Sequence, residues 1–268
     1  MAVTTHNGPG ITTGFDPAEG CMGAFGAAAS DFMEERMKGL AEETVQEGFA
    51  ILPGAQLRPL LPENEFIAFA RFWSDLPLDT TLHDGGRYRH RRYGRLRVEI
   101  GDGGTEFEIL PHKTFRQDGI PLWKGADREF APAAEEALLH PAMTALVGFD
   151  TDLARSITGQ RSWEVGIHQI RMVAHAGEHG LPTPEGRHRD GHNYIGMHLI
   201  RRDGCVGGES TVYPDSGEAV RLTLTEPMDS IFVDDRLVTH EVSPTEAVGE
   251  TGIRDMLLVD INPFGSDA

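Results

Sequence analysis

The sequence contains little of what marks several large classes of protein. It has only two cysteines in 268 residues, Cys21 and Cys205, so we expect neither a disulfide framework nor a cysteine-based metal site. No apolar stretch approaches the roughly 18 residues that a membrane-spanning helix needs. The first 14 residues lack a basic start followed by an apolar segment, so we expect no secretory signal and a cytoplasmic protein.

Positive charge is also scarce. The chain has 24 Lys and Arg against 42 Asp and Glu, a formal net charge of −18. This balance disfavours nucleic acids and anionic membrane surfaces as partners. It does not exclude a small anionic substrate, because a local arginine cluster can override the overall field. We therefore expect a small-molecule substrate. Separately, we expect a monomer or homodimer.

The length and the pattern of elements predict one domain. All-β barrels of about this size commonly stay undivided. Residues 1–20 are rich in Gly, Thr and Pro and are expected to form a flexible tail. We assign residues 21–268 to a single domain, with a helical part at about 21–150 and a β-rich core at about 160–262.

Helical periodicity marks the first half of the chain, and short strands between turn residues mark the second. Such a second half is typical of an antiparallel barrel or sandwich. Pro132 suits a first helical position, whereas Pro141 would kink or split the helix that follows. Helices are expected at 30–46, 62–76 and 132–147, and strands at 49–52, 107–110, 163–173, 194–200, 210–213, 220–224, 230–233, 239–242 and 255–261.

The segment PEGRHRDGH (residues 184–192) has the pattern of a metal site. On a strand, His188 and Asp190 would project from the same face. His240, 52 positions after His188, is the best third ligand. Two His and one carboxylate on one side of a metal are typical of non-haem Fe(II) oxygenases. His192 continues the alternation, but a third ligand from the same short strand would give poor facial geometry.

Arg254 lies 14 positions after His240, on or just before the last expected strand. An Fe(II) oxygenase of this kind uses 2-oxoglutarate, whose distal carboxylate needs a fixed cation. Arginine suits that task because it is permanently charged and bidentate. The alternative for Arg254 is a surface ion pair at the start of a strand.

Other arginines are candidates for binding the substrate. Residues 87–97 contain six arginines, and strand-like alternation places Arg89 and every second residue on one face. Either these charges are solvated, or one or two of them bind a carboxylate in a cavity. Gln169 and Arg171 share a face of another expected strand. Arg171 is a candidate for the carboxylate of the substrate or of 2-oxoglutarate, with a structural ion pair as the alternative.

Several motifs occur in an order that resembles a known family. Over roughly residues 45–262, the chain is similar to the bacterial 2-oxoglutarate/Fe(II) dioxygenases that include L-isoleucine 4-hydroxylase and the pipecolic acid hydroxylases. The matching motifs are GGRYRHRRYG (85–94), PEGRHRDGH (184–192), GGES (207–210), DDRLVTHEVSP (234–244) and RD (254–255).

The resemblance implies a fold and an activity. The fold is mainly β with N-terminal helices and has a jelly-roll (double-stranded β-helix, cupin-like) core. The implied reaction uses Fe(II), 2-oxoglutarate and O2 to hydroxylate an unactivated C–H of a free L-amino acid, aliphatic or cyclic such as pipecolate, and releases succinate and CO2. By position, His188, Asp190 and His240 match the iron ligands and Arg254 matches the 2-oxoglutarate anchor. Asp190 favours hydroxylation, because halogenating relatives lose this carboxylate.

Two other functions remain open from the sequence. A Zn-dependent hydrolase could use His188 and Asp190 with either His192 or His240, and would need neither O2 nor 2-oxoglutarate. A non-catalytic cupin-like protein could hold a ligand in the barrel, with the histidines in structural roles. Metal analysis and a succinate-release assay distinguish these from an oxygenase.

Overall fold

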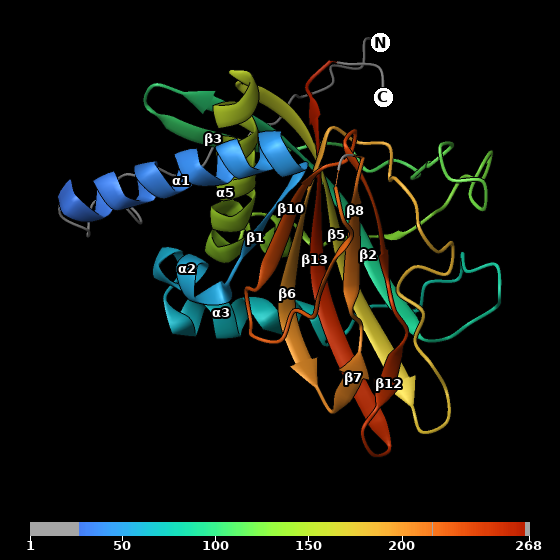
Figure 1. Ribbon diagram of the computed structural model, residues 1–268. Coiled ribbons are helices and arrows are strands. Elements are labelled where there is room, and N and C mark those ends of the chain that lie inside the picture. Colours follow the sequence, from blue (N-terminus) through green and yellow to red (C-terminus); the bar gives the residue numbers. More distant parts are fainter. Residues whose placement is uncertain (1–26, 216, 266–268) are drawn as a thin grey trace, which may run out of the picture.

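Two β-sheets face each other, and helices cover the outer side of the larger one (Figure 1). The computed structural model describes residues 27–215 and 217–265, so the expected tail at residues 1–20 and Cys21 lie outside the described part. The large sheet has the strand order β1-β10-β6-β13-β5-β2-β3, with β4 beside β2. A three-stranded sheet has the order β11-β8-β9, and β12 pairs with β7.

Most strands are short antiparallel elements of the kind that the second half of the sequence predicts, and four strands, β1 to β4, come from the first half. The N-terminal helices, the predominance of strands and the two sheets make a jelly-roll core with a helical cover. The strands are β1 (Phe49–Leu52), β2 (Arg89–Gly101), β3 (Gly104–Ile109), β4 (Ala131–Pro132), β5 (Ser162–His175), β6 (Tyr194–Asp203), β7 (Cys205–Gly207), β8 (Ser210–Pro214), β9 (Val220–Leu222), β10 (Ser230–Asp234), β11 (Val238–Val242), β12 (Thr245–Ala247) and β13 (Thr251–Pro263).

The helices lie in the first 158 residues and pack together on one side of the large sheet (Figure 1). None of the helices within the described residues is long and apolar enough to cross a membrane. The helices are α1 (Ala27–Glu47), α2 (Gly54–Leu57), α3 (Glu63–Ala70), α4 (Glu135–Leu138) and α5 (Pro141–Thr158), with 3-10 turns at Arg58–Leu60 and Arg71–Trp73.

The helix predicted at 132–147 has the wrong boundaries, whereas the predicted split at Pro141 is confirmed, since α4 ends at Leu138 and α5 begins at Pro141. Pro132 belongs to β4, and the long helix α5 begins only at Pro141. The ring of Pro141 suits the first helical position, and Nδ1 of His140 accepts a hydrogen bond from the backbone N–H of Ala142, 3.2 Å away. The helix predicted at 62–76 is shorter, because α3 ends at Ala70 and continues as a 3-10 turn.

The two faces of the large sheet bury two different apolar clusters. On β13, Leu257 and Val259 pack against the helices, whereas Met256 and Leu258 contact the cluster between the two sheets. That inner cluster includes Val212 of β8, from the smaller sheet. Because successive side chains on a strand point to opposite faces, every second residue of a long strand faces the space between the sheets. This alternation decides which polar residues face the space between the sheets and which face the helices.

Candidate active site

His188 and His240 are brought together by backbone hydrogen bonds between the β5–β6 connection and β11. The N–H of His188 donates to the carbonyl of His240 (3.0 Å), and the N–H of His240 donates to the carbonyl of His188 (2.9 Å). The prediction that His188 and Asp190 lie on a regular strand is wrong, since His188 forms an isolated bridge and Asp190 lies in the loop that follows. The loop still presents both side chains to one point.

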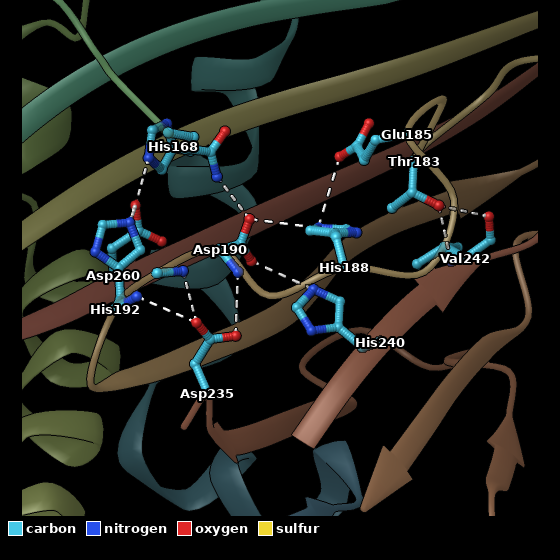
Figure 2. A network of polar contacts seen from close by, with 12 residues as sticks. His168, Thr183, Glu185, His188, Asp190, His192, Asp235, His240, Val242 and Asp260 are labelled. Carbon is cyan, nitrogen blue, oxygen red and sulfur yellow. Dashed lines mark hydrogen bonds and ion pairs between the residues drawn. The ribbon is translucent and has the colours of Figure 1, made fainter. Parts of the chain in front are cut away.

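The side chains of His188, Asp190 and His240 form a compact triad (Figure 2). Nε2 of His188 lies 3.4 Å from Oδ1 of Asp190, and Nε2 of His240 lies 3.3 Å from Oδ2 of the same carboxylate. The two imidazole centroids are 4.6 Å apart. Within the described part of the chain, this is the single group of at least three His, Cys, Asp or Glu side chains whose ligand atoms could hold a metal ion.

The surroundings fix the orientation of the triad. Nδ1–H of His188 donates to the carbonyl of Gly186 at 2.8 Å, so Nε2 is the ring nitrogen left to face Asp190 and a metal. The carboxylate of Asp235 accepts three backbone N–H groups from the loop at residues 190–192, at 2.7 to 3.2 Å (Figure 2). The side-chain amide of Gln117 donates to Oδ1 of Asp190 at 2.7 Å. Each contact restricts how a ligand can turn.

The charges in the triad favour a cation at its centre. Burial alone would raise the pKa of Asp190, but hydrogen bonds from His188 and His240 and their positive charge lower it well below its usual value. Burial lowers the pKa of His188, and the neighbouring carboxylates outweigh it and raise the pKa to about 9. Protonation of His188, or a divalent cation bound in place of that proton, offsets the negative charge of Asp190.

These residues fit a ferrous ion. Two neutral imidazoles and one carboxylate are the ligand set of the non-haem Fe(II) oxygenases, and they leave the other coordination positions for small molecules. The N–O separations of 3.3 and 3.4 Å are close to the distance of about 3 Å between adjacent ligands of an octahedral ion. The hydrogen bond at Nδ1 of His188 is of the kind that metal-binding histidines make.

Residues 70–260 match a family model described as 2OG-Fe dioxygenase. The chain belongs to this family. Its members use Fe(II), 2-oxoglutarate and O2, and the matched region contains the whole triad and all strands from β2 to β12.

A curated relative of this dioxygenase is L-isoleucine-4-hydroxylase from Bacillus thuringiensis. It is 28% identical to the chain over 142 residues, which is 50% of the chain and 58% of the relative. The match therefore spans little more than half the length of that enzyme.

Solved structures share the fold over most of the chain. A BsmA homologue from Methylobium petroleophilum PM1 has a TM-score of 0.77 and 29% identity, covering 87% of this chain and 95% of its own. IDO from Bacillus thuringiensis has a TM-score of 0.70 and 19% identity, covering 85% and 96%. The Fe(II)/α-ketoglutarate-dependent dioxygenase TqaL has a TM-score of 0.68 and 17% identity, covering 89% and 90%.

Arg254 of the dioxygenase lies on the inner face of β13, two residues from Met256. Its side chain is buried, its Nε has no hydrogen-bond partner, and no carboxylate in the described part forms an ion pair with it. Burial, together with the charge of Arg202, lowers its pKa to about 10. A Cβ at position 208 would lie 3.1 Å from Cδ of Arg254, so Gly208 leaves room for this guanidinium.

Gln169 and Arg171 lie on the opposite face of the large sheet from the triad. They alternate with Ile170, which contacts the inner cluster, and they pair with Leu257 and Asp255 of β13. Arg171 makes a bidentate ion pair with the buried Asp255, with N–O distances of 2.7 and 2.8 Å. The structure therefore gives Arg171 the structural ion pair that the sequence left open, and it does not bring Gln169 or Arg171 to the triad.

Arg89 lies on the inner face of β2, where its Nε pairs with Asp79 at 2.8 Å. The alternation predicted for the arginine-rich run is present over β2, so Arg89 and Arg91 share the inner face. His192 also faces inward, but Nδ1 accepts a hydrogen bond from Asn262 and Nε2 lies 3.2 Å from Asp260. It is directed away from the triad.

Sequence reasoning missed several residues around the triad. Asp235 was within a recognised motif but carried no signal of its role in binding loop N–H groups. Gln117 and Arg128 lie in the loop-like segment 113–130, which has no periodicity that could assign them a face. Glu185 lies within the PEGRHRDGH motif, which gave no signal of its role, and its carboxylate lies 3.6 Å from Nε2 of His188.

Proposed function

We propose that this dioxygenase hydroxylates an unactivated C–H of a free L-amino acid, either aliphatic or a cyclic imino acid such as pipecolate. The substrate, 2-oxoglutarate and O2 would yield the hydroxylated amino acid, succinate and CO2. The observation that carries the proposal is a triad of two His and one Asp in the same inter-sheet space as a buried arginine without a carboxylate partner. The L-isoleucine-4-hydroxylase relative supports the choice of a free amino acid.

In this proposal His188, Asp190 and His240 hold the ferrous ion. A bound Fe(II), together with 2-oxoglutarate, would supply the O2-dependent oxidation. Asp235 keeps the loop that bears Asp190 in place through three backbone hydrogen bonds. The side-chain amide of Gln117 donates to Oδ1 of Asp190 and so restricts the rotation of this carboxylate. The chain thus contributes orientation, and the cofactors contribute the oxidising power.

Arg254 is the proposed anchor for the distal carboxylate of 2-oxoglutarate. A buried guanidinium without an anion is costly, and a carboxylate bound bidentately removes that cost. Arg254 has a free Nε and no competing acidic partner among the described residues. Arg202, whose Nη1 is also buried without a partner, adds positive charge beside it.

The test is an anaerobic titration of the purified protein with Fe(II) and 2-oxoglutarate. We expect a weak visible charge-transfer band in the wild type and none in Asp190→Ala. An aerobic panel of free amino acids should then yield at least one product with the mass of one added oxygen atom, together with succinate. Glu178→Gln, at an exposed position outside the triad, is a matched control that should keep the band.

Other outcomes identify other functions. The absence of a band in the wild type would refute chelation of a bound ferrous ion by 2-oxoglutarate. Turnover without O2 and 2-oxoglutarate would indicate a Zn-dependent hydrolase. Ligand binding without succinate release under any condition would indicate a non-catalytic binding protein.

We also propose that residues 21–268 act as one cytoplasmic domain, as a monomer or homodimer. The large sheet supports a single unit, because β1, β2 and β3 join the same sheet as β5, β6 and β13. Size-exclusion chromatography with light scattering would give the oligomeric state, and a larger assembly would contradict it.

A further inference from the structure

Three arginines are buried together near the triad with one carboxylate between them. Arg89 and Arg91 come from the inner face of β2, and Arg128 comes from the loop before β4; their exposed fractions are 4%, 7% and 3%. Asp79 pairs with Arg89. Among the described residues, no carboxylate forms an ion pair with Arg91 or Arg128. This arginine cluster therefore holds more buried positive charge than its acidic neighbours neutralise.

Aromatic rings pack against the two guanidiniums that lack a carboxylate partner, and Arg91 also donates a hydrogen bond to Nδ1 of His168 at 2.6 Å. The Arg91 guanidinium lies 4.1 Å from the ring centroid of Phe130, and that of Arg128 lies 4.4 Å from that of Trp123. Nε of Arg91 and Nε of Arg128 are both buried without hydrogen-bond partners. Burial and mutual repulsion lower the pKa of Arg91 to about 9, and burial and Arg89 lower that of Arg128 to about 10. Such a site gains stability when an anion binds.

Glu185 is a buried carboxylate near the triad, and one of its two oxygens has no partner. The Glu185 side chain is 9% exposed, and its Oε2 is buried without a hydrogen-bond partner. Its Oε1 is 3.6 Å from Nε2 of His188, and Figure 2 shows the carboxylate directed towards that ring. Within the described residues, no Lys or Arg pairs with Glu185. The buried Oε2 of Glu185 is therefore left without a partner, and a bound cation would satisfy it.

Both features adjoin the triad. Arg128 donates a hydrogen bond to the side-chain oxygen of Gln117, whose amide donates to Oδ1 of Asp190 at 2.7 Å. Arg128 is thus two hydrogen bonds from a metal ligand, and Glu185 contacts another ligand directly. A small molecule with one negative and one positive group could satisfy both beside the reacting centre.

We propose that Arg91 and Arg128 bind the α-carboxylate of the substrate and that Glu185 binds its α-ammonium group. This assignment rests on the proposed function and makes it specific for a zwitterion with both groups free. Arg89, already paired with Asp79, positions the cluster rather than binding the substrate. A compound that lacks either charged group would leave a buried charge unpaired, which is the usual source of strong discrimination.

The cluster is distinct from the proposed 2-oxoglutarate anchor. Arg89 and Arg254 pair with the same residue, Met172, from opposite sides of β5. Two strand spacings therefore separate their backbones by about 10 Å. Substitutions in the arginine cluster should weaken amino acid binding and leave 2-oxoglutarate binding unchanged, and Arg254→Met should do the reverse.

The experiment measures binding without turnover. The Fe(II)–2-oxoglutarate band is recorded anaerobically while the standard L-amino acids and L-pipecolate are added, each beside its decarboxylated and deaminated counterpart. For L-isoleucine these are 2-methylbutylamine and 3-methylpentanoate, and for L-pipecolate they are piperidine and cyclohexanecarboxylate. In the wild type, at least one amino acid should perturb the band, and its two counterparts should not do so at the same concentration.

The variants assign the roles. Arg91→Met and Arg128→Met should each raise the half-saturating amino acid concentration by about tenfold or more, because each removes a charged hydrogen bond. Glu185→Gln should weaken the amino acid but not the deaminated acid, so that the preference between the two narrows. Arg92→Met on the opposite face of β2 and Glu178→Gln at an exposed position are matched controls and should behave like the wild type.

Each result supports or overturns the assignment. If the band forms but no amino acid perturbs it, or if the amine or deaminated acid binds equally well, the zwitterion site is refuted while the oxygenase proposal stands. Wild-type binding in Arg128→Met or Arg91→Met refutes it too. Should a methionine variant fail to fold, Arg128→Lys keeps the charge and should show intermediate affinity. Absence of the band in the wild type would instead refute the proposed function.

Discussion

Two groups of two histidines and one aspartate lie near each other on the inner side of this protein, and they are built for different tasks. The first is the triad of His188, Asp190 and His240. The second joins His168 and His192 through Asp260 (Figure 2). Residue types alone do not distinguish them, since both contain the same side chains.

The hydrogen-bond partners of the rings make the difference. In the second group, Nε2–H of His168 donates to Asp260 at 2.7 Å and Nδ1 accepts from Arg91 at 2.6 Å, so no lone pair of His168 remains for a metal. In the triad, a backbone carbonyl occupies only Nδ1 of His188, and Nε2 faces the shared point. His188 thus keeps one nitrogen for a metal, whereas both nitrogens of His168 are engaged by protein groups.

The largest expected effect comes from replacing His240 and His192 by alanine, one at a time. We expect His240→Ala to abolish the charge-transfer band and succinate formation, because two ligands cannot hold the ion in the required geometry. His192→Ala should keep the band, since its ring contacts Asp260 and Asn262 and not the triad. Anaerobic absorption spectra of both variants check this. Loss of the band in His192→Ala alone would show that the ligand set is wrong.

A second comparison concerns arginines on the two faces of the large sheet. Arg254→Met should raise the half-saturating 2-oxoglutarate concentration by about a hundredfold, because a buried bidentate contact is lost. Arg171→Met should leave that value unchanged and lower the free energy of unfolding by about 3 kcal/mol, because it leaves Asp255 buried without its partner. Titration of the band and urea unfolding measure the two effects. Equal 2-oxoglutarate affinity in both variants would contradict the anchor.

The smallest expected effect is a pH dependence of the folding stability, which arises from His168 in the second group. Burial and the charge of Arg91 lower the pKa of His168 to about 4, below the value of about 6.5 in an unfolded chain. The unfolded state therefore takes up a proton first as the pH falls, and folding stability is lost from about pH 6.5 downwards. Between pH 7 and pH 5 the loss from His168 should be about 2 kcal/mol.

Urea unfolding of the wild type and His168→Gln at both pH values measures this contribution. The variant should be less stable at pH 7 and should lose less stability on acidification, since it has no group that titrates there. Equal losses in the two proteins would show that His168 is not held neutral.

The elements that the sequence predicted well are those with a strong local pattern. The strand at Phe49–Leu52 has the predicted bounds, and the predicted strands at 163–173 and 255–261 form the centres of β5 and β13. The helix predicted at 132–147 failed because the pattern did not show which of Pro132 and Pro141 begins the helix. Both prolines are compatible with a first helical turn, and the pairing of β4 with β2 decides between them.

What the sequence determined by itself was the kind of chemistry, because three ligands and an arginine in a family-typical order require only their identities and spacing. What only the tertiary structure decided was which charged side chains are unpaired. Asp190 and Gln117 are 73 positions apart, and Arg171 and Asp255 are 84 apart. Such partners depend on sheet register and on which face each residue takes, and a shift of one residue would exchange the faces. The arginines that can bind a ligand are therefore a property of the folded sheet.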